Sequence, residues 1–242
     1  MTRRALRSRS PRSGRSWRVS ADSRSPLVVT IDGPAASGKS STAQMVAARL
    51  RMRHLDSGMI YRSVTAARLR GGDAPEHWTE QSVLDAATRV SLAPGATSFA
   101  PRLDGEDCEA EIRGEAVTGL VSLVAKMPHV RAWVNALVRA TAAAYEIVVD
   151  GRDMGTAVFP DARLKVWLVA APDERARRRI LQRMGREPTV RELAAEAAEL
   201  EARDRKDREQ TQPAADAVWI DTTGITQVEQ VERIVGMAEG MR

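Results

Sequence analysis

The stretch that most constrains this chain is IDGPAASGKSS, residues 31–41. Gly33, Gly38, Lys39 and Ser40 fit the pattern G-x-x-x-x-G-K-[ST]. The residues before it, 27–31, are rich in β-branched side chains and are typical of a strand, whereas residues 40–50 have the apolar spacing of a helix. Because strand, glycine loop and helix follow in this order, the sequence predicts a loop that holds a chain of phosphates.

The chemistry of such a loop assigns roles to its residues. Its glycines let backbone N–H groups close around phosphate oxygens, and the helix N-terminus adds its positive end. Lys39 is placed to reach the β- and γ-phosphates of ATP, and the Ser40 hydroxyl to bind Mg²⁺. A chance match is the alternative, but the composition of this chain gives only about 0.002 expected matches. We therefore expect ATP to contact Gly33, Pro34, Ala35, Ala36, Ser37, Gly38, Lys39, Ser40 and Ser41.

Length and composition limit the remaining choices. A chain of 242 residues fits one domain, with room for a small inserted lobe. The single Cys108 excludes an internal disulfide and suits a reducing cytosol, and the three histidines have no metal-ligand spacing. No apolar run approaches the length of a membrane span. We expect a cytoplasmic monomer that binds small molecules and no membrane.

The formal net charge of +5 comes from one end of the chain. Residues 1–25 hold eight arginines and only one acidic residue, Asp22, so residues 26–242 are close to neutral. The basic segment has no apolar periodicity, and we expect a disordered tail without an essential role. An organelle transit peptide, a nucleic-acid-binding arm and a misassigned start are the alternatives.

Strand-like and helix-like segments alternate along residues 26–242. Strands are expected at 27–31, 53–55, 147–150, 164–170 and 217–221, with helices at 40–50, 58–69, 173–184, 189–207 and 226–239. This alternation predicts an α/β fold with a parallel sheet covered by helices on both faces. Residues 72–145 interrupt it with a helix at 76–87, a small antiparallel meander at 90–103, and two helices at 117–126 and 130–144. We expect a core of 26–71 and 146–242 and an inserted lobe of 72–145.

Three further clusters bear on what receives the phosphate. The first, DSGMIYR at 56–62, follows the second strand, where α/β sheets bind ligands. Asp56 or Ser57 acting as a simple helix N-cap is the ordinary interpretation. The functional interpretation places Tyr61 and Arg62 in the cleft, with Arg62 binding a phosphate.

The second cluster, DGRDMG at 150–155, directly follows a buried strand. A surface turn with an arginine–aspartate pair would explain it without a function. At the carboxyl end of a strand, however, Asp150 is placed to hold Mg²⁺ through water, and Arg152 to bind the acceptor phosphate.

The third cluster is an arginine run at 175–186, and Arg175, Arg179, Arg183 and Arg186 share one helix face. A solvated charged face is the common explanation for such a run. A lid for phosphoryl transfer, here at 175–187, is the alternative, because arginines neutralise the charge on the transferring group. On that interpretation Lys39, Arg152, Arg175 and Arg179 are catalytic.

Together these segments resemble the bacterial cytidylate kinase family, among the nucleoside monophosphate kinases. The resemblance runs from about residue 27 to 240 and includes IDGPAASGKSS, LDSGMIYR, AEIRGEAV, VSLVAKMPHVR, VDGRDMGTAVFPDA, ERARRR, ARDRKD and PAADAVWIDTTG. DGRDMGTAVFPDA is its most specific part, since the phosphate loop is shared widely. The resemblance implies a P-loop kinase fold with an enlarged nucleotide-binding lobe. It also implies transfer of the γ-phosphate from ATP to CMP or dCMP with Mg²⁺.

By this resemblance the CMP-binding residues are Ser57, Tyr61, Arg62, Ser122, Arg131, Arg152, Asp153, Arg203 and Asp207. The chemistry of the base agrees, because cytosine offers an N4 donor that a carboxylate such as Asp153 accepts. Arg131 and Ser122 can donate to the cytosine acceptors N3 and O2, and Arg203 and Asp207 would hold the ribose. Around Gln210 the chain departs from the family pattern, since an expected arginine is missing and the loop is shorter.

Two rival functions remain from the sequence. Another P-loop small-molecule kinase, related to shikimate or adenylate kinases, would use different acceptor motifs. A nucleic-acid-binding protein would use the basic tail, and the near-neutral remainder of the chain argues against it.

Overall fold

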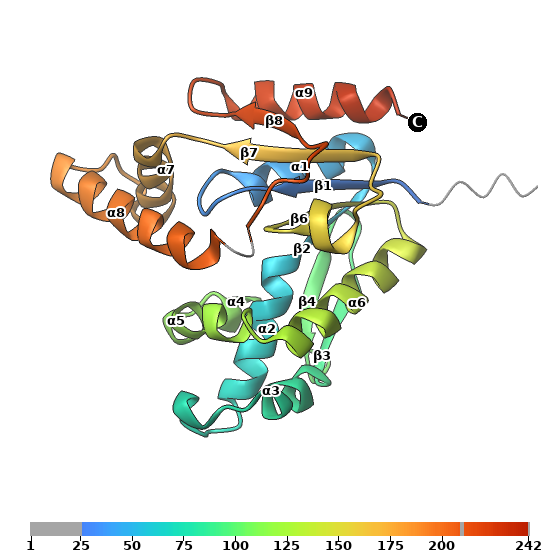
Figure 1. Ribbon diagram of the computed structural model, residues 1–242, viewed down its shortest axis with the longest axis vertical. Helices are drawn as coiled ribbons and strands as arrows, with labels where there is room; N and C mark the ends of the chain where they lie inside the picture. The colour runs from blue at the N-terminus through green and yellow to red at the C-terminus, as the bar shows by residue number, and fades with distance from the viewer. Residues whose placement is uncertain (1–25, 209–210, 242) are drawn as a thin grey trace, which may run out of the picture.

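The computed structural model describes residues 26–208 and 211–241. The basic segment 1–25 and the departure at Gln210 lie outside the described residues. The predicted alternation is confirmed as a five-stranded parallel sheet, in the order β2-β6-β1-β7-β8 (Figure 1). Its strands are β1 (Val28–Asp32), β2 (Arg53–Asp56), β6 (Ile147–Gly151), β7 (Leu164–Val169) and β8 (Val218–Asp221).

Strand register brings the motifs to one edge of this sheet. Asp32, at the end of β1, pairs with Gly151 of β6 on one side and with Trp167 of β7 on the other. Asp56, at the end of β2, pairs with Asp150 of β6. The phosphate loop, the DSGMIYR segment and the DGRDMG segment therefore all leave the sheet at its carboxyl edge, where parallel sheets bind ligands.

Helices cover both faces of the sheet. On one face α1 (Lys39–Leu50) and α9 (Gln227–Glu239) bury a core that contains Val29, Ile31, Val46, Leu168 and Ile234. On the other face α2 (Ser57–Leu69) and α6 (Pro128–Ala144) pack against β2 and β6, and their core continues into the inserted residues. Both faces are apolar, so the strands read as near-continuous hydrophobic runs.

The insertion packs below the sheet around α2 (Figure 1). The predicted meander is present as an antiparallel sheet of β3 (Val90–Pro94), β4 (Phe99–Leu103) and β5 (Glu106–Asp107). Its helical parts are η1 (Pro75–His77), α3 (Glu80–Ala87), α4 (Glu109–Ile112) and α5 (Glu115–Val124), together with α6. The short α4 was not predicted, and the segment expected as one helix at 76–87 is split between η1 and α3. Trp78 is the C-cap of η1, and Thr79 begins α3 as its N-cap with a capping box.

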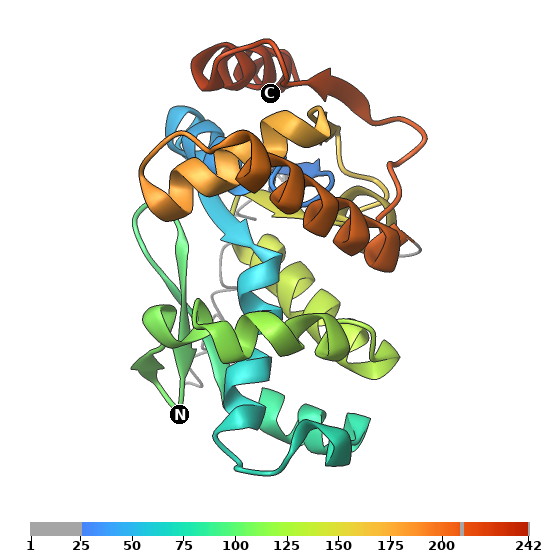
Figure 2. The same ribbon diagram turned by 90° about the vertical axis from the view of Figure 1, so that its left-hand side faces the viewer.

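A helical hairpin of α7 (Pro172–Met184) and α8 (Val190–Asp207) crosses the molecule above the insertion (Figure 2). Gly185 ends α7 with a φ of 69°, a left-handed conformation that favours glycine. Arg186 therefore lies beyond the helix and pairs with Glu192 of α8. The expected four-arginine helix face is wrong at this position, because the left-handed turn redirects the chain.

A single π-helical turn, η2 (Met154–Val158), follows β6 and was not predicted. The buried Asp32 carboxylate accepts hydrogen bonds from the N–H groups of Met154, at 2.9 Å, and Gly155, at 2.8 Å. Burial raises the pKa of Asp32 to about 6, against the opposing effect of these two hydrogen bonds. The end of β1 thereby fixes the start of the segment that follows Arg152 and Asp153.

Candidate active site

The phosphate loop has a backbone that only glycine permits at its first position. Gly33 has a φ of 150°, and a side-chain carbon there would lie 2.2 Å from the Leu168 carbonyl oxygen. Gly38 is the N-cap of α1 with a φ of 88°. Because the first N–H groups of a helix lack partners within the helix, the loop and the first turn of α1 offer donors to an anion.

Lys39 lies at the centre of this arrangement. Its Nζ donates a 2.6 Å hydrogen bond to the carbonyl of Pro34, which bends the side chain back over the loop. Burial, followed by the charge of Arg152, lowers the pKa of Lys39 from 10.5 to about 7, while Asp150 and Asp32 act in the opposite direction. The negative charge of a bound phosphate would stabilise the protonated form of Lys39 and raise its pKa.

Asp150 joins the loop to the neighbouring strands. Its Oδ2 accepts a 2.6 Å hydrogen bond from the Ser40 hydroxyl, and its Oδ1 lies 2.6 Å from Nε2 of His54. Burial alone would lower the pKa of His54, but the hydrogen bond and charge of Asp150 outweigh it, and the net shift is upward. Both oxygens of Asp150 are therefore held in place.

The pair formed by Ser40 and Asp150 fits Mg²⁺, a hard cation that takes oxygen ligands. Across 26–208 and 211–241 no cluster of three or more acidic, histidine or cysteine side chains could hold a metal alone. Magnesium commonly binds through one or two protein oxygens together with phosphates and water. The pair therefore suits a magnesium ion that arrives with a nucleotide.

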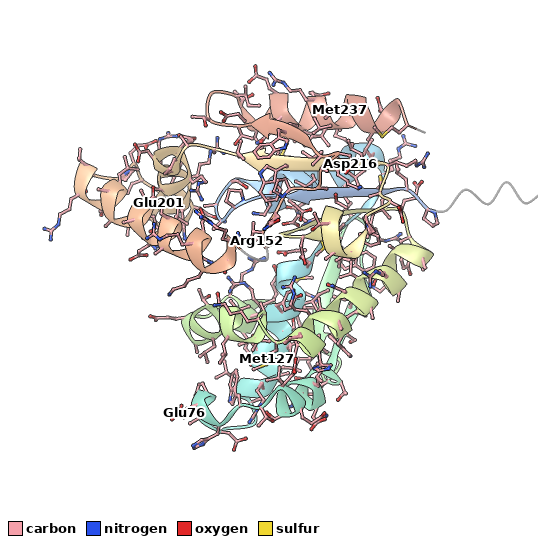
Figure 3. The ribbon with its side chains drawn as sticks, in the orientation of Figure 1. Glu76, Met127, Arg152, Glu201, Asp216 and Met237 are labelled. Atoms are coloured by element: carbon pink, nitrogen blue, oxygen red, sulfur yellow. The ribbon has the colours of Figure 1, made fainter. Side chains whose placement is uncertain are left out.

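A pocket of about 450 Å³ opens between the sheet edge and the insertion, a size typical of small-molecule sites. Figure 3 shows Arg152 in this region, between the sheet and the inserted helices. All nine residues expected to bind CMP line it, together with Lys39, Ser40, Asp150 and Arg179. Lys39 and Asp207, which are 168 positions apart in sequence, thus meet in one place.

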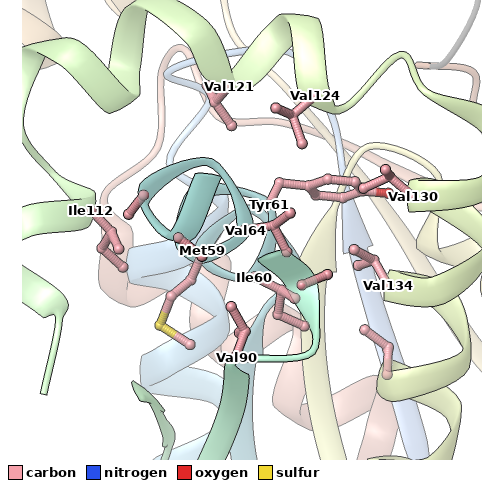
Figure 4. Packing of buried hydrophobic residues seen from close by; sticks show 14 of the residues in the cluster. Met59, Ile60, Tyr61, Val64, Val90, Ile112, Val121, Val124, Val130 and Val134 are labelled. Atoms are coloured by element: carbon pink, nitrogen blue, oxygen red, sulfur yellow. The ribbon is translucent and has the colours of Figure 1, made fainter. Parts of the chain in front are cut away.

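One wall of the pocket carries groups suited to a base. The Asp153 carboxylate forms an ion pair with Arg131, whose Nη1 also donates to the Ala125 carbonyl at 3.1 Å. Burial raises the pKa of Asp153, and the charge of Arg131 opposes that shift. Figure 4 shows the Tyr61 ring near Val124, Val130 and Val134.

Several buried polar atoms of the pocket have no hydrogen-bond partner among the residues that the structure describes. They include the Tyr61 hydroxyl, Nη1 of Arg152 and Nε of Arg203. Burial raises the pKa of Tyr61 to about 12, so this hydroxyl is a donor at neutral pH. Because buried polar groups are nearly always hydrogen-bonded, these three atoms point to a polar ligand.

Several arginine side chains line the pocket and make it positively charged. Arg62 donates to Thr118 Oγ1 at 2.9 Å and to the Ile112 carbonyl at 3.2 Å. Burial, and then the charge of Arg203, lower the pKa of Arg62, and burial likewise lowers that of Arg152. Asp207 is 3.3 Å from Arg152, but the cations that line the pocket outnumber its carboxylates. An anionic group such as a phosphate would relieve the mutual repulsion of these cations.

A second, larger pocket of about 930 Å³ adjoins the first. The N-cap Gly38 and, in α1, Ser41 and Gln44 line it together with Arg178 of α7 and Thr226 before α9. Lys39, Ser40 and Arg179 line both pockets, so the two cavities meet at the phosphate loop. This arrangement has space for a phosphate donor on one side of Lys39 and an acceptor on the other.

The two lid arginines expected to be catalytic lie in different places. Arg179 lines both pockets and pairs with Glu196 of α8 at 3.0 Å. Arg175 is only 5% exposed and lines neither of these pockets. Its guanidinium instead contacts Asp204 of α8 and the Ala35 carbonyl of the phosphate loop.

Sequence reasoning left some neighbours of the site unassigned. Arg113 lines both pockets and lies within AEIRGEAV, a segment that carries the resemblance but received no role. His54 and Asp32 touch the site through Asp150 and η2. Asp32 lies within the IDGPAASGKSS stretch, which the sequence had marked. The π-turn η2 that Asp32 binds had no recognisable pattern in the sequence.

Comparison with known proteins agrees with the geometry. The cytidylate kinase family model matches residues 29–240. A cytidylate kinase from Streptomyces griseus is 40% identical over 90% of this chain and 95% of its own length. One from Geobacillus kaustophilus is 43% identical over 86% of this chain and 95% of its own.

Among solved structures, an uncharacterized protein from Eubacterium ventriosum aligns with a TM-score of 0.50 at 10% identity, over 88% of this chain and 98% of that one. Likeness at that identity concerns the fold alone. The parallel sheet, its flanking helices, the loop after β1 and the inserted antiparallel sheet are those of a P-loop kinase, as predicted. With the match over residues 29–240 and relatives at about 40% identity, this chain belongs to the cytidylate kinase family.

Proposed function

We propose that this protein is an ATP-dependent kinase that transfers the γ-phosphate of ATP to CMP or dCMP, giving CDP or dCDP. One observation carries the proposal most directly. The phosphate loop and the DGRDMG segment open onto the same pocket, with Lys39 and Arg152 both among its lining residues. Donor and acceptor phosphates bound to these groups would lie next to each other.

The donor occupies the larger pocket under this proposal. The phosphate loop, residues 33–41, holds its phosphates through the N-terminus of α1 and through backbone N–H groups other than that of Ala35, which donates to Asp204. Lys39 compensates charge on the β- and γ-phosphates. Ser40 and Asp150 would hold Mg²⁺, which when bound neutralises phosphate charge.

The acceptor occupies the smaller pocket. Arg62 and Arg152 bind its phosphate, and Arg203 and Asp207, on the last turns of α8, face its ribose. Asp153 accepts from N4 of cytosine, while Arg131 and Ser122 donate to its acceptors. Uracil would present a carbonyl to the Asp153 carboxylate, and this repulsion disfavours UMP.

Catalysis then depends on position and charge. The acceptor phosphate is already an ionised nucleophile, so the reaction needs no general base. Lys39, Arg152 and Arg179 surround the place where the two pockets meet and would stabilise charge on the transferring group. We assign Arg175 a different role, argued below.

Movement of two parts would complete the site. The insertion, residues 72–145, carries Arg131 and Ser122, and the lid segment, 175–187, carries Arg179. Closure of both over bound substrates would exclude water, which would otherwise compete as acceptor. The proposal includes a monomeric protein in the cytoplasm, and the free Cys108 suits that reducing compartment.

Two alternatives are separable by experiment. Another P-loop small-molecule kinase would share the donor pocket but not the pairing of Asp153 with Arg131. A nucleic-acid-binding role would rest on residues 1–25.

No helix in the described part of the chain is long and apolar enough to span a bilayer.

A coupled assay of ATP consumption with CMP, dCMP, UMP, AMP and shikimate tests the proposal. We expect turnover with CMP or dCMP to exceed turnover with the other three by roughly tenfold or more, since a specific base contact contributes about 1–3 kcal/mol. Preference for shikimate or AMP would favour the rival kinases. Strong salt-dependent RNA binding that is lost on removing residues 1–25 would favour the nucleic-acid role.

A further inference from the structure

The phosphate-loop residue Ala35 is held on both of its backbone groups by the α7–α8 hairpin. Its N–H donates to Oδ1 of Asp204 at 3.2 Å, and its carbonyl accepts from Nη1 of Arg175 at 3.0 Å. The same Arg175 nitrogen is 2.5 Å from Oδ2 of Asp204. These three contacts close a ring, and they turn the Ala35 amide away from any phosphate in the loop.

Ala35 and Arg175 of this ring are buried, Asp204 is partly exposed, and the ring lies against an apolar cluster. Ala35 is 4% exposed and Arg175 is 5% exposed. Ala35 also packs in a small cluster with Ala176 of α7 and with Ala197 and Leu200 of α8. Charge-assisted hydrogen bonds in such surroundings are stronger than neutral ones and fix geometry closely.

The last turns of α8 face two ligand sites at once. Arg203 and Asp207 line the acceptor pocket, and Asp207 approaches Arg152 at 3.3 Å. Asp204, between them in sequence, points about 100° away from Arg203 around the helix and reaches the phosphate loop. One rigid helical segment therefore connects the acceptor pocket to the loop that holds the donor.

We propose that Asp204, held by Arg175, is a positioning residue that fixes the phosphate loop relative to the acceptor-binding end of α8. It lines neither of the two pockets and acts through Ala35. The inference rests on the proposed function, because it assigns a role in aligning a donor with an acceptor. In-line transfer tolerates little error in that alignment, so loosening the ring weakens donor binding and slows transfer.

The test uses Asp204→Asn in the full-length protein. Asparagine keeps the size of the side chain but leaves Arg175 without a carboxylate. Since a hydrogen bond to a charged group contributes roughly ten- to a hundredfold in an equilibrium, and the loop keeps its other anchors, we expect the Kd for ADP to rise about tenfold. Calorimetry measures this, and hydrogen exchange of the Ala35 amide, followed by NMR, reports directly on the bond. We expect faster exchange at Ala35, a lower kcat, and a Kd for CMP within about twofold of wild type.

Two control variants separate positioning from general stability. Thr189→Ala removes the N-cap of α8, whose hydroxyl accepts a 3.3 Å hydrogen bond from the Glu192 N–H at the opposite end of the helix from Asp204. Glu201→Gln removes an exposed acid from the same helix, with only a 3.8 Å pair to Arg205. We expect a lower Tm for Thr189→Ala and ADP binding within about twofold of wild type for both.

Arg175→Lys provides a second variant in case Asp204→Asn fails to fold. Lysine keeps the charge but lacks the planar group that contacts Ala35 and Asp204 together, so ADP binding should weaken in the same direction. Wild-type ADP affinity in a folded Asp204→Asn or Arg175→Lys variant would overturn the inference. Equal weakening in Thr189→Ala would also overturn it, because helix stability would then explain the effect. If the wild-type protein binds ADP but does not phosphorylate CMP, the proposed function fails while these binding results still decide the role of Asp204.

Discussion

Nucleotide binding should draw a proton onto Lys39. In the ligand-free protein, burial and then the neighbouring Arg152 lower the pKa of this lysine to about 7. The phosphates of ADP would surround Nζ with opposite charge and restore the ammonium form. A lysine whose pKa is lowered is mostly neutral above that pKa. If the nucleotide binds only the charged lysine, the protein takes up more protons on binding as the pH rises.

The size of the effect follows from the pKa. At pH 8 about nine-tenths of Lys39 side chains are neutral, so binding should take up about 0.9 proton. Between pH 7.5 and 8.5 the Kd for ADP should rise about eightfold, since each binding event must first protonate the lysine. Asp32 and Asp56, with pKa values raised to about 6 chiefly by burial, are already ionised in this range and contribute little.

Calorimetry in two buffers of different ionisation enthalpy measures the proton uptake. Lys39→Met serves as the control, because it fills similar space without a titratable group and should abolish both the uptake and the pH slope. Wild-type binding at pH 8 with uptake below about 0.2 proton would refute this reasoning. Lys39 would then already be protonated in the ligand-free protein, and burial would lower its pKa by less than stated above.

Three further predictions concern activity. Lys39→Ala should keep the fold, by circular dichroism and Tm, and lose about two to three orders of magnitude in kcat; near-wild-type turnover would contradict the donor-site assignment. Asp153→Asn should reduce the CMP/UMP ratio of kcat/KM by roughly 10- to 100-fold, because the amide can also donate to uracil; an unchanged ratio would move base recognition to Arg131 and Ser122. A chain that starts at Ser25 should retain full kcat, and a large loss in the folded, shorter protein would show that residues 1–25 matter.

Local sequence determined most of the fold. The phosphate loop needed only its glycines and the strand and helix around it, because left-handed backbone at Gly33 and Gly38 has a direct residue signature. The meander at 90–103 was visible from its turn residues in the same way. The π-turn at 154–158 was not, because it depends on the Asp32 carboxylate, which lies more than 120 positions earlier in the chain.

The site was predictable where it lies at strand ends and less so where it depends on distant partners. Asp150 and Arg152 follow a buried strand, and that position alone pointed to a ligand site. Arg175 and Arg179 looked equivalent, since both lie on one face of an arginine-rich helix. They differ in their partners on α8. Asp204 holds Arg175 beside the phosphate loop, whereas Glu196 pairs with Arg179 at the pockets. Such pairings appear only when the hairpin is folded.

The most direct measurement of the central proposal is phosphorus NMR of the purified full-length protein with ATP, Mg²⁺ and CMP. We expect the CMP resonance to decline while the two resonances of CDP and the β-phosphate resonance of ADP appear, in equal amounts. The Lys39→Ala protein under the same conditions should leave CMP unchanged. Release of inorganic phosphate in place of CDP, or no change in CMP and dCMP while another acceptor is phosphorylated, would contradict a cytidylate kinase activity.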